Sequence, residues 1–299
     1  MGLGDLSLAV LVTALWGINF SVIKIGLGTF DPLLLAALRF IFCALPWVFF
    51  FKRPNVPFKY VFWYGLVLGA LQFSLLFLGI REGLSAGLAS VVLQLQVFFT
   101  ICFGAIVLKD QVKVRQLAGM VVAFAGIVTI AGISGSNNLL AVLMVVAAAA
   151  SWGVANIIVK KSGAKDMLGF MVWSSVIPPL PLLAISLWTN GPAHVAADLR
   201  HIGWSGVGAV LYLVYPTTLF GYSIWNYLLR KHKTSLVAPL TLLVPIFGML
   251  SSMVIFHEDL TARKLIAVVL VIAGLLINMF GFPFRKQAAA PASPQVTPR

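Results

Sequence analysis

The sequence predicts an all-α integral membrane protein in which ten transmembrane helices form two inverted five-helix repeats. Composition is the first observation: 61% of the 299 residues are hydrophobic and only 10% are charged, whereas soluble domains carry about 25% charged residues. The second observation is a series of long apolar runs, and the third is an apolar phrase that occurs twice. Together they indicate a chain that lies in lipid rather than in water.

Ten apolar runs follow one another with short connections. Each is close to the roughly 20 residues that a helix needs to cross a bilayer, and the longest connection, near 189–202, is too short for a soluble domain. The Ala- and Pro-rich stretch 285–299 predicts a disordered cytoplasmic tail. The spans are expected near residues 6–27, 33–51, 60–80, 84–107, 115–133, 139–160, 168–188, 203–229, 235–256 and 264–283.

The net charge of +13 is explained by membrane orientation and does not indicate a nucleic acid partner. If the N-terminus is cytoplasmic, an even number of spans returns the C-terminus to the same side. Of the 21 Lys and Arg, 15 (21 − 6) then fall in cytoplasmic loops and the tail, as the positive-inside rule predicts. The exceptions are Lys24, Arg39, Arg81, Arg200, Arg263 and Lys264.

The repeated phrase is ALWGINFSVIK at 14–24 and ASWGVANIIVK at 150–160, an offset of 136 (152 − 16). Asp31 matches Asp166 at an offset of 135, and the segment 87–93 matches 235–241 at an offset of 148. Each repeat holds five spans, and because five is odd the second repeat must enter the membrane from the opposite side. We therefore predict a first repeat at 1–136 and an inverted repeat at 137–284, a construction of many secondary transporters.

Several of these stretches resemble the EamA domains of the drug/metabolite transporter superfamily. They are WGINFSVIK, LRF at 38–40, GLASVVLQLQ, SWGVANIIVKK and GYSIWNYLLRKHKTSLVAPLTLLVPIFG. RPNVP at 53–57, QLQVFFT at 94–100 and VWSSVIPPLP at 172–181 resemble more specifically the bacterial inner-membrane exporters of cysteine and O-acetylserine. One turn departs from the family pattern, because Lys109-Asp110-Gln111 replaces a Gly-Glu-Arg-like sequence.

The resemblance implies a ten-helix exporter in the bacterial inner membrane whose partner is a small-molecule substrate, an amino acid or a derivative. O-acetylserine and cysteine are the expected cargo, moved by alternating access between the two repeats. Two alternatives stay open at this point. One is export of other amino acids or of amphipathic drugs and metabolites, and the other is a membrane scaffold without transport.

Arg39 is the foremost candidate for substrate binding. It lies about seven residues into the second span, and its counterpart in the other repeat is Ser174. Ionisable residues inside spans are costly and usually face a cavity, and a guanidinium can bind a carboxylate through two hydrogen bonds. The alternative is a structural charge that reaches the membrane surface or pairs with Asp31 or Glu82.

Aromatic and amide side chains complete the predicted substrate site. In span eight, Tyr212, Tyr215, Leu219, Tyr222 and Asn226 recur at helical spacing, with Trp225 beside them. The alternative to a cavity wall is a packing seam between helices, which applies to every member of this set. The predicted substrate-binding residues are Arg39, Trp16, Asn19, Gln72, Gln94, Trp152, Asn156, Tyr215, Tyr222 and Trp225.

Gln94 and Gln96 pose a choice, because residues two apart on an α-helix point about 200° apart. Only one of them is expected to face the cavity, and interhelical hydrogen bonding is the alternative for each. Glycines with GxxxG spacing, Gly65 with Gly69 and the series Gly79, Gly83, Gly87, predict close helix contacts, either within the chain or in a homodimer.

The sequence gives no sign of an enzyme, a metal site or a cofactor. No Asp, Glu or His lies near the centre of a span, and neither HExxH nor the nucleotide-binding GxxxxGK[ST] occurs. A mid-membrane acid is a common device for proton coupling. We therefore expect exchange, facilitated export, or coupling through a peripheral group such as Glu82 or Glu258.

Overall fold

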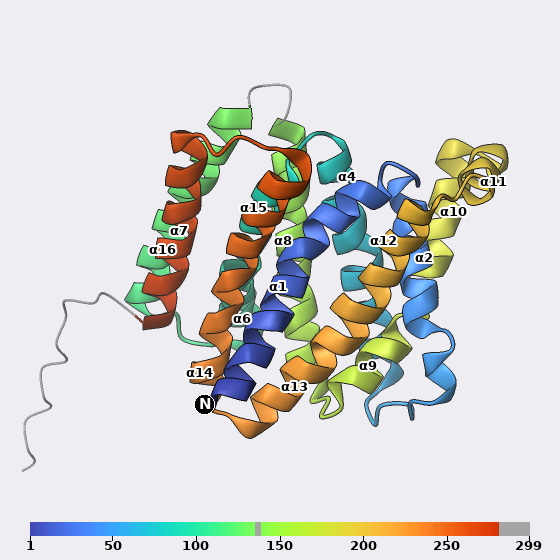
Figure 1. The fold of residues 1–299 in the computed structure, drawn as a ribbon. Coiled ribbons are helices and arrows are strands. Elements are labelled where there is room, and N and C mark those ends of the chain that lie inside the picture. Colours follow the sequence, from blue (N-terminus) through green and yellow to red (C-terminus); the bar gives the residue numbers. More distant parts are fainter. Residues whose placement is uncertain (135–138, 281–299) are drawn as a thin grey trace, which may run out of the picture.

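The computed structural model describes residues 1–134 and 139–280, and these ranges contain helices and no strand (Figure 1). Within these ranges, ten helices are long and apolar enough to cross a membrane, which confirms the predicted fold class. The expected repeat boundary at residue 136 and the expected tail at 285–299 lie outside the described residues.

Several spans consist of consecutive helical segments. The first five spans are α1 (Leu3–Gly26), α2 (Pro32–Ala44) with η1 (Trp47–Phe49), α3 (Phe58–Tyr64) with η2 (Gly65–Gln72) and α4 (Phe73–Arg81), α5 (Ala86–Val92) with η3 (Leu93–Leu95) and α6 (Gln96–Leu108), and α7 (Val114–Ser134). The other five are α8 (Leu139–Ser162), α9 (Met167–Ser174) with α10 (Pro179–Asn190), α12 (Trp204–Val214) with η5 (Tyr215–Phe220) and α13 (Gly221–Lys231), α14 (Thr234–Val237) with η6 (Ala238–Leu242) and α15 (Leu243–Phe256), and α16 (Ala262–Phe280). The short helix α11 (Pro192–Arg200) follows α10.

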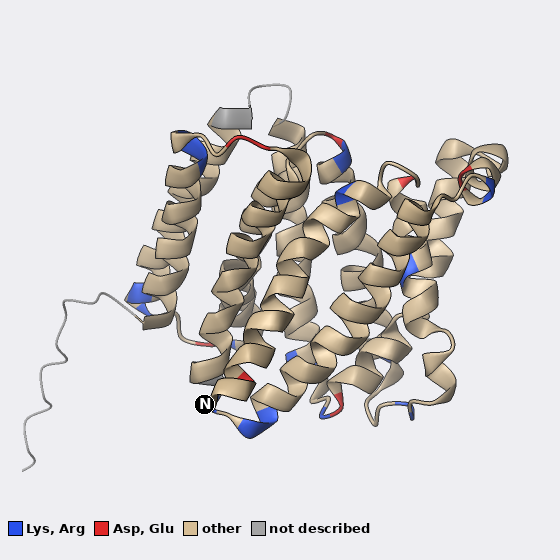
Figure 2. Ribbon diagram, in the orientation of Figure 1, with Lys and Arg blue, Asp and Glu red and all other residues tan. Residues whose placement is uncertain are grey.

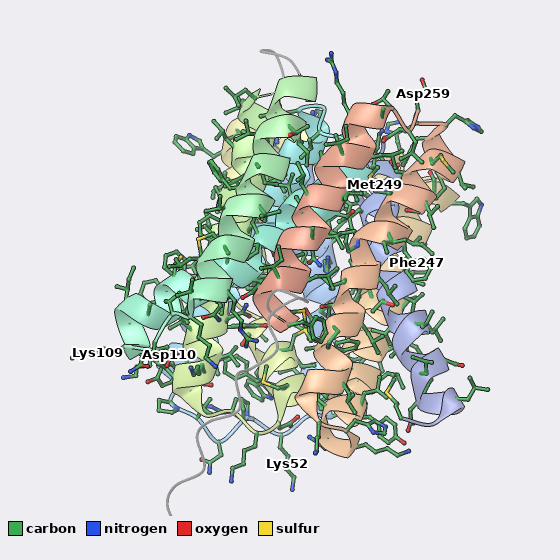
Figure 3. All side chains as sticks on the ribbon, turned by 90° about the vertical axis from the view of Figure 1, so that its left-hand side faces the viewer. Lys52, Lys109, Asp110, Phe247, Met249 and Asp259 are labelled. Atoms are coloured by element: carbon green, nitrogen blue, oxygen red, sulfur yellow. The ribbon has the colours of Figure 1, made fainter. Side chains whose placement is uncertain are left out.

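The two repeats are inverted with respect to each other. We call the end of the bundle that carries the N-terminus the N-terminal face, at the bottom of Figure 1. In Figure 3, Lys52, Lys109 and Asp110 of the first repeat lie toward this face, and Asp259 of the second repeat lies at the opposite face. Charged residues gather toward these two ends of the bundle (Figure 2), as expected for a protein whose middle is surrounded by lipid.

The repeated Trp-Gly pair marks two equivalent helix crossings. A Cβ added to Gly17 on α1 would lie 2.8 Å from the nitrogen of Gly248, directly after Phe247 on α15. A Cβ added to Gly153 on α8 would lie 2.8 Å from the Cβ of Phe99 on α6. Phe247 and Phe99 are themselves 148 residues apart (247 − 99). The first helix of each repeat therefore packs against the fourth span of the other repeat, and glycine permits the close approach.

The helices depart from α geometry at matched places in the middle of the membrane. Segments η2 and η5 are π-helical and interrupt the third span of each repeat. Segments η3 and η6 are 3₁₀-helical and interrupt the fourth span of each repeat. Irregular backbone at membrane depth is tolerated where it is buried in protein or lines a cavity, and π-helical turns often occur at functional sites.

Most of the predicted glycine contacts lie inside the chain. A Cβ on Gly69 would meet Pro178, one on Gly79 would meet Val145 of α8, and one on Gly87 would meet Met249 of α15. These glycines therefore serve contacts between helices of one chain. Helices α7 and α16 pack together at the side of the bundle (left in Figure 1), away from the cavity described next.

Candidate functional site

A cavity of about 310 Å³ lies between the two repeats, at the lower end of the range of roughly 300–1,000 Å³ typical of small-molecule sites. Every predicted site residue except Tyr215 lines it. The lining residues are Trp16, Asn19, Phe20, Arg39, Tyr64, Gln72, Phe73, Leu76, Leu93, Gln94, Gln96, Trp152, Asn156, Val159, Met167, Thr217, Tyr222, Trp225, Thr241 and Val244. Whether these residues bind a substrate stays a prediction.

Arg39 is buried in the membrane interior without an acidic partner among the described residues. It lies seven residues from the start of α2, which is ~10 Å along the helix. Its Nη2 donates to Thr218 Oγ1 at 3.1 Å, and its guanidinium carbon lies 4.1 Å from the centre of the Phe73 ring. Nε and Nη1 have no hydrogen-bond partner in the described chain. A buried cation with free donors is unfavourable by itself and favours a bound anion.

Asp31, considered as a partner of Arg39, is engaged elsewhere. Its carboxylate caps the N-terminus of α2 by accepting hydrogen bonds from the backbone nitrogens of Leu33 and Leu34. It also accepts one from Ser186 Oγ at 2.8 Å and lies 3.5 Å from Arg81 Nη1. The pairing of Arg39 with Asp31 is therefore wrong for this conformation.

Two amides add unpaired polar atoms to the same cavity. Asn19 Oδ1, Gln72 Oε1 and Gln72 Nε2 are buried and have no hydrogen-bond partner among the described residues. The cavity thus combines free donors on Arg39 and Gln72 with free acceptors on Asn19 and Gln72. Buried polar groups are normally paired, so this set is suited to a ligand that carries both acceptors and donors.

Aromatic rings form one wall of the cavity. Trp16 lies with its ring centre 5.4 Å from that of Tyr222 and 5.2 Å from that of Trp225. Its indole Nε1 donates to the backbone oxygen of Thr217 at 2.9 Å, which holds the ring in place. Aromatic faces attract apolar groups and also ammonium groups, through the ring quadrupole.

Tyr215 lies apart from this cavity. It is 39% exposed and borders a separate apolar pocket with Trp47, Leu219 and Phe220. The stripe predicted along span eight assumed a continuous α-helix, but the π-helical segment η5 begins at Tyr215 and changes the direction of the residues on either side of it. Tyr212 is also occupied outside the cavity, since its hydroxyl donates to the backbone oxygen of Leu15.

Gln94 and Gln96 both line the cavity, contrary to the expectation that only one would face it. The 3₁₀ turn η3 ends at Leu95 and interrupts the α-helical geometry on which that expectation rested. Gln94 Nε2 donates to the backbone oxygen of Thr241 at 3.3 Å, and Gln96 Oε1 accepts a hydrogen bond from Asn156 Nδ2 at 2.9 Å. The two amides therefore connect spans four, six and nine around the cavity.

Some lining and supporting residues were not expected from the sequence. Tyr64 and Phe73 flank η2, and Thr217 and Thr218 lie within η5, where Thr218 contacts Arg39. A Pro-Thr-Thr sequence in the middle of an apolar span is a signal that could have identified the threonines. Nothing in the apolar pattern distinguishes Tyr64 and Phe73 from ordinary core residues.

One ion pair connects the two repeats beyond each Gly crossing. Lys24 Nζ lies 3.1 Å from Glu258 Oε1 at the opposite face, and Lys160 Nζ lies 2.7 Å from Asp110 Oδ2 at the N-terminal face. Each acid follows a residue with left-handed backbone, His257 or Lys109. Burial alone would raise the pKa of Glu258, but hydrogen bonds, including the one from Lys24, outweigh it and lower that pKa below its ordinary value.

Within residues 1–134 and 139–280, no group of three or more His, Cys, Asp or Glu side chains could hold a metal ion. An internal two-fold repeat, interrupted helices and a polar cavity between the repeats define the architecture of secondary transporters. The chain belongs to the EamA-like transporter family, whose family model matches residues 4–132 and 139–280.

Individual relatives cover nearly the whole chain. A protein of Salmonella typhimurium named "Probable amino-acid metabolite efflux pump" is 43% identical over 94% of this chain and 96% of its own length. A protein of Escherichia coli with the same name is 40% identical over 93% and 96%. A crystal structure with a TM-score of 0.57 and 17% identity covers 93% of this chain and 98% of the solved one, which shows a shared fold.

Proposed function

We propose that this protein exports amino-acid-derived metabolites across the bacterial inner membrane, by alternating access between its two repeats. O-acetylserine and cysteine are the proposed cargo. The proposal is supported by family membership and by the two relatives named as amino-acid metabolite efflux pumps. The chain's own residues line the cavity, so a single chain is the proposed unit of transport.

The observation that carries the proposal is the unpaired Arg39 in the cavity. All amino acids share a carboxylate, and a guanidinium with free donors provides a charge-assisted partner for it. The amides of Asn19 and Gln72 provide acceptors for an ammonium group and donors for an acyl oxygen. We propose that Arg39 holds the carboxylate and that these amides orient the remainder of the substrate.

The described conformation is proposed to face the cytoplasm. The distribution of Lys and Arg supports a cytoplasmic N-terminal face, and the cavity reaches Val159 and Met167 near that face. Toward the opposite face its lining ends at Phe20 and Leu76, well within their spans. No Asp, Glu or His of the described residues lines the cavity, so exchange or facilitated export is proposed in place of a proton relay.

The test is counterflow in proteoliposomes that contain the purified chain. Vesicles are loaded with unlabelled O-acetylserine, and entry of the labelled compound is followed for the wild type, Arg39→Gln and Arg39→Lys. Entry that falls in Arg39→Gln supports both the cargo and the role of Arg39. Entry that is unchanged in both variants would refute the carboxylate role.

A competition series decides between the proposed cargo and the alternatives. Unlabelled amino acids with small polar, aliphatic and aromatic side chains are added outside the vesicles. Because Trp16, Trp152 and Trp225 line the cavity, stronger competition by apolar amino acids would move the assignment to that class. A folded wild type that transports none of them would overturn the transport proposal and favour a membrane scaffold.

A further inference from the structure

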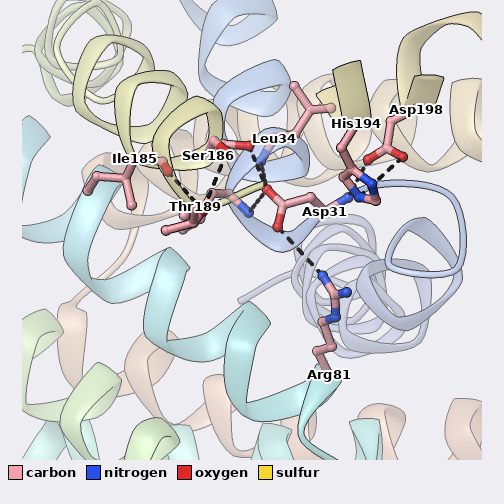
Figure 4. A network of polar contacts seen from close by, with 9 residues as sticks. Asp31, Leu34, Arg81, Ile185, Ser186, Thr189, His194 and Asp198 are labelled. Atoms are coloured by element: carbon pink, nitrogen blue, oxygen red, sulfur yellow. Dashed lines mark hydrogen bonds and ion pairs between the residues drawn. The ribbon is translucent and has the colours of Figure 1, made fainter. Parts of the chain in front are cut away.

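One ion pair at the opposite face has no counterpart at the N-terminal face among the described residues. At the opposite face, Arg81 in the last turn of α4 lies 3.5 Å from Asp31, the residue that precedes α2. This pair joins the end of the third span to the start of the second (Figure 4). Asp31 is only 6% exposed, and its backbone nitrogen donates to Asp198 at 2.9 Å. Helix α4 packs against α2 and also touches α1, and we interpret this face as the closed one.

The second repeat has the same two residue types at the N-terminal face. Asp166 caps α9, the start of its second span, and Arg230 lies in the last turn of α13, the end of its third span. Asp166 matches Asp31 at the repeat offset of 135, and Arg230 lies one residue beyond the position that matches Arg81 (230 − 81 = 149). The π-helical segments upstream also differ in length, eight residues in η2 and six in η5.

These two residues are apart in the described conformation. Asp166 is exposed and accepts a hydrogen bond from the backbone nitrogen of Gly169, and no ion pair involves it among the described residues. Arg230 is exposed as well. Its neighbour Lys231 is already engaged with Asp5 at 3.0 Å. Arg230 is therefore the basic residue of this turn that is available to Asp166.

Both of these helices, α9 and α13, border the cavity. Met167 on α9, Trp225 on α13 and Val159 on α8 all line the cavity toward the N-terminal face. The contact of α13 with α9 is much less extensive than the equivalent contact of α4 with α2. Lys24–Glu258 and Lys160–Asp110, which connect the two repeats, are formed at both faces at once, so they do not distinguish open from closed. Asp5 of the first repeat also pairs with Lys231 and His232 of the second at the N-terminal face.

We propose that Asp166 and Arg230 form an ion pair that closes the N-terminal face in the other conformation, as Asp31 and Arg81 close the opposite face here. When the Asp31–Arg81 pair breaks, α4 moves away from α2. Because the repeats are inverted, the equivalent movement in the second repeat brings α13 into contact with α9. This inference rests on the alternating access of the proposed function and adds the residues that hold each closed state.

Cross-linking tests this inference without any substrate. Cys43 and Cys102 are first replaced by Ala, and Asp166→Cys is combined with Arg230→Cys in membrane vesicles treated with a short bismaleimide. We expect slow cross-linking that becomes several-fold faster when Arg81→Gln weakens the opposite face. Asp110→Cys with Lys160→Cys is the control on the same face and should react quickly in both backgrounds. A 166–230 rate that Arg81→Gln leaves unchanged, while the control reacts, overturns the proposal.

Charge exchange provides a second readout in the counterflow assay. Asp166→Arg and Arg230→Asp alone should each reduce exchange at least tenfold, and the two together should restore most of it. Lys161→Asp, at an exposed residue of the same face, should have little effect. A double variant as inactive as the single ones refutes the pairing. Cross-linking as expected with no counterflow in the wild type would instead refute the cargo and leave the ion pair supported.

Discussion

Replacing Arg39 with Gln should weaken the binding of carboxylate-containing substrates far more than it affects folding. Two of the three guanidinium nitrogens have no partner in the described chain, and both are available to a carboxylate. A hydrogen bond to a charged group is worth about 1.5–3 kcal/mol. Loss of one such bond therefore lowers affinity roughly 10- to 140-fold, at about 1.4 kcal/mol per factor of ten. Arg39→Lys keeps the positive charge but lacks the planar guanidinium that can donate two parallel hydrogen bonds. Its affinity for carboxylate substrates should lie between that of Arg39→Gln and that of the wild type.

The assay compares each amino acid with its own α-amide, which lacks the negative charge. Binding is measured by competition in counterflow and by the rise in unfolding temperature that a ligand causes. The variant should lose affinity for the acid and keep its affinity for the amide. An equal loss for both compounds would refute the reasoning. Because Arg39 is a buried cation without an acidic partner, Arg39→Gln should unfold at the same temperature as the wild type or a higher one, which separates lost binding from lost folding.

Three further predictions concern the contacts between repeats. Gly17→Ala should destabilise the fold by about 1–3 kcal/mol in thermal unfolding, because the added Cβ meets Phe247 and Gly248. The control is Gly4→Ala on the same helix, which has open space around it and should be neutral or slightly stabilising. Glu258→Gln should lower the unfolding temperature near pH 7, because a carboxylate with a lowered pKa stabilises the fold above its ordinary value of 4.5. That advantage of the wild type should shrink as the pH falls below 4.5 and vanish once the pH lies below the lowered pKa of the folded state. A difference that persists in that lowest range contradicts the role of the charged form. Lys160→Met should change the free energy of unfolding by less than about 1 kcal/mol, since the Lys160 and Asp110 side chains are 60% and 51% exposed. A larger loss of stability would show that this exposed pair holds the repeats together.

The topology could be predicted from the sequence because it depends on few physical quantities. Apolar runs of bilayer length determine the number of spans, and an odd number of spans per repeat determines the inversion. The phrase shared by residues 14–24 and 150–160 predicted the repeat, and the structure adds that its glycines, Gly17 and Gly153, occupy equivalent crossings. Much of the cavity could be anticipated as well, because polar and aromatic residues in the middle of spans are costly in lipid.

The remaining details depend on local backbone geometry that a helical period of 3.6 residues does not describe. The π-helical turn at Tyr215 separates that residue from Tyr222, and the 3₁₀ turn before Gln96 directs both glutamines to the cavity. The ion-pair partner of Asp31 could not be predicted from the sequence either. Arg39 is nearer in the sequence, but Arg81 from another span forms the pair, and nothing in the apolar pattern reveals which ends of spans meet.

The asymmetry between Arg39 and Ser174 has a consequence for the side from which the proposed carrier saturates first. Ser174 is buried, and its hydroxyl donates to the backbone of its own helix, so only one repeat offers a charge to the cargo. A substrate held by Arg39 presents different ends to the two membrane faces, and its apparent affinity should differ when it is offered from each side. In the absence of an energy source, the side with the higher apparent affinity must also have the lower maximal rate. The concentration ratio across the membrane then decides which way the cargo flows, and the charge decides only at which side the carrier saturates first.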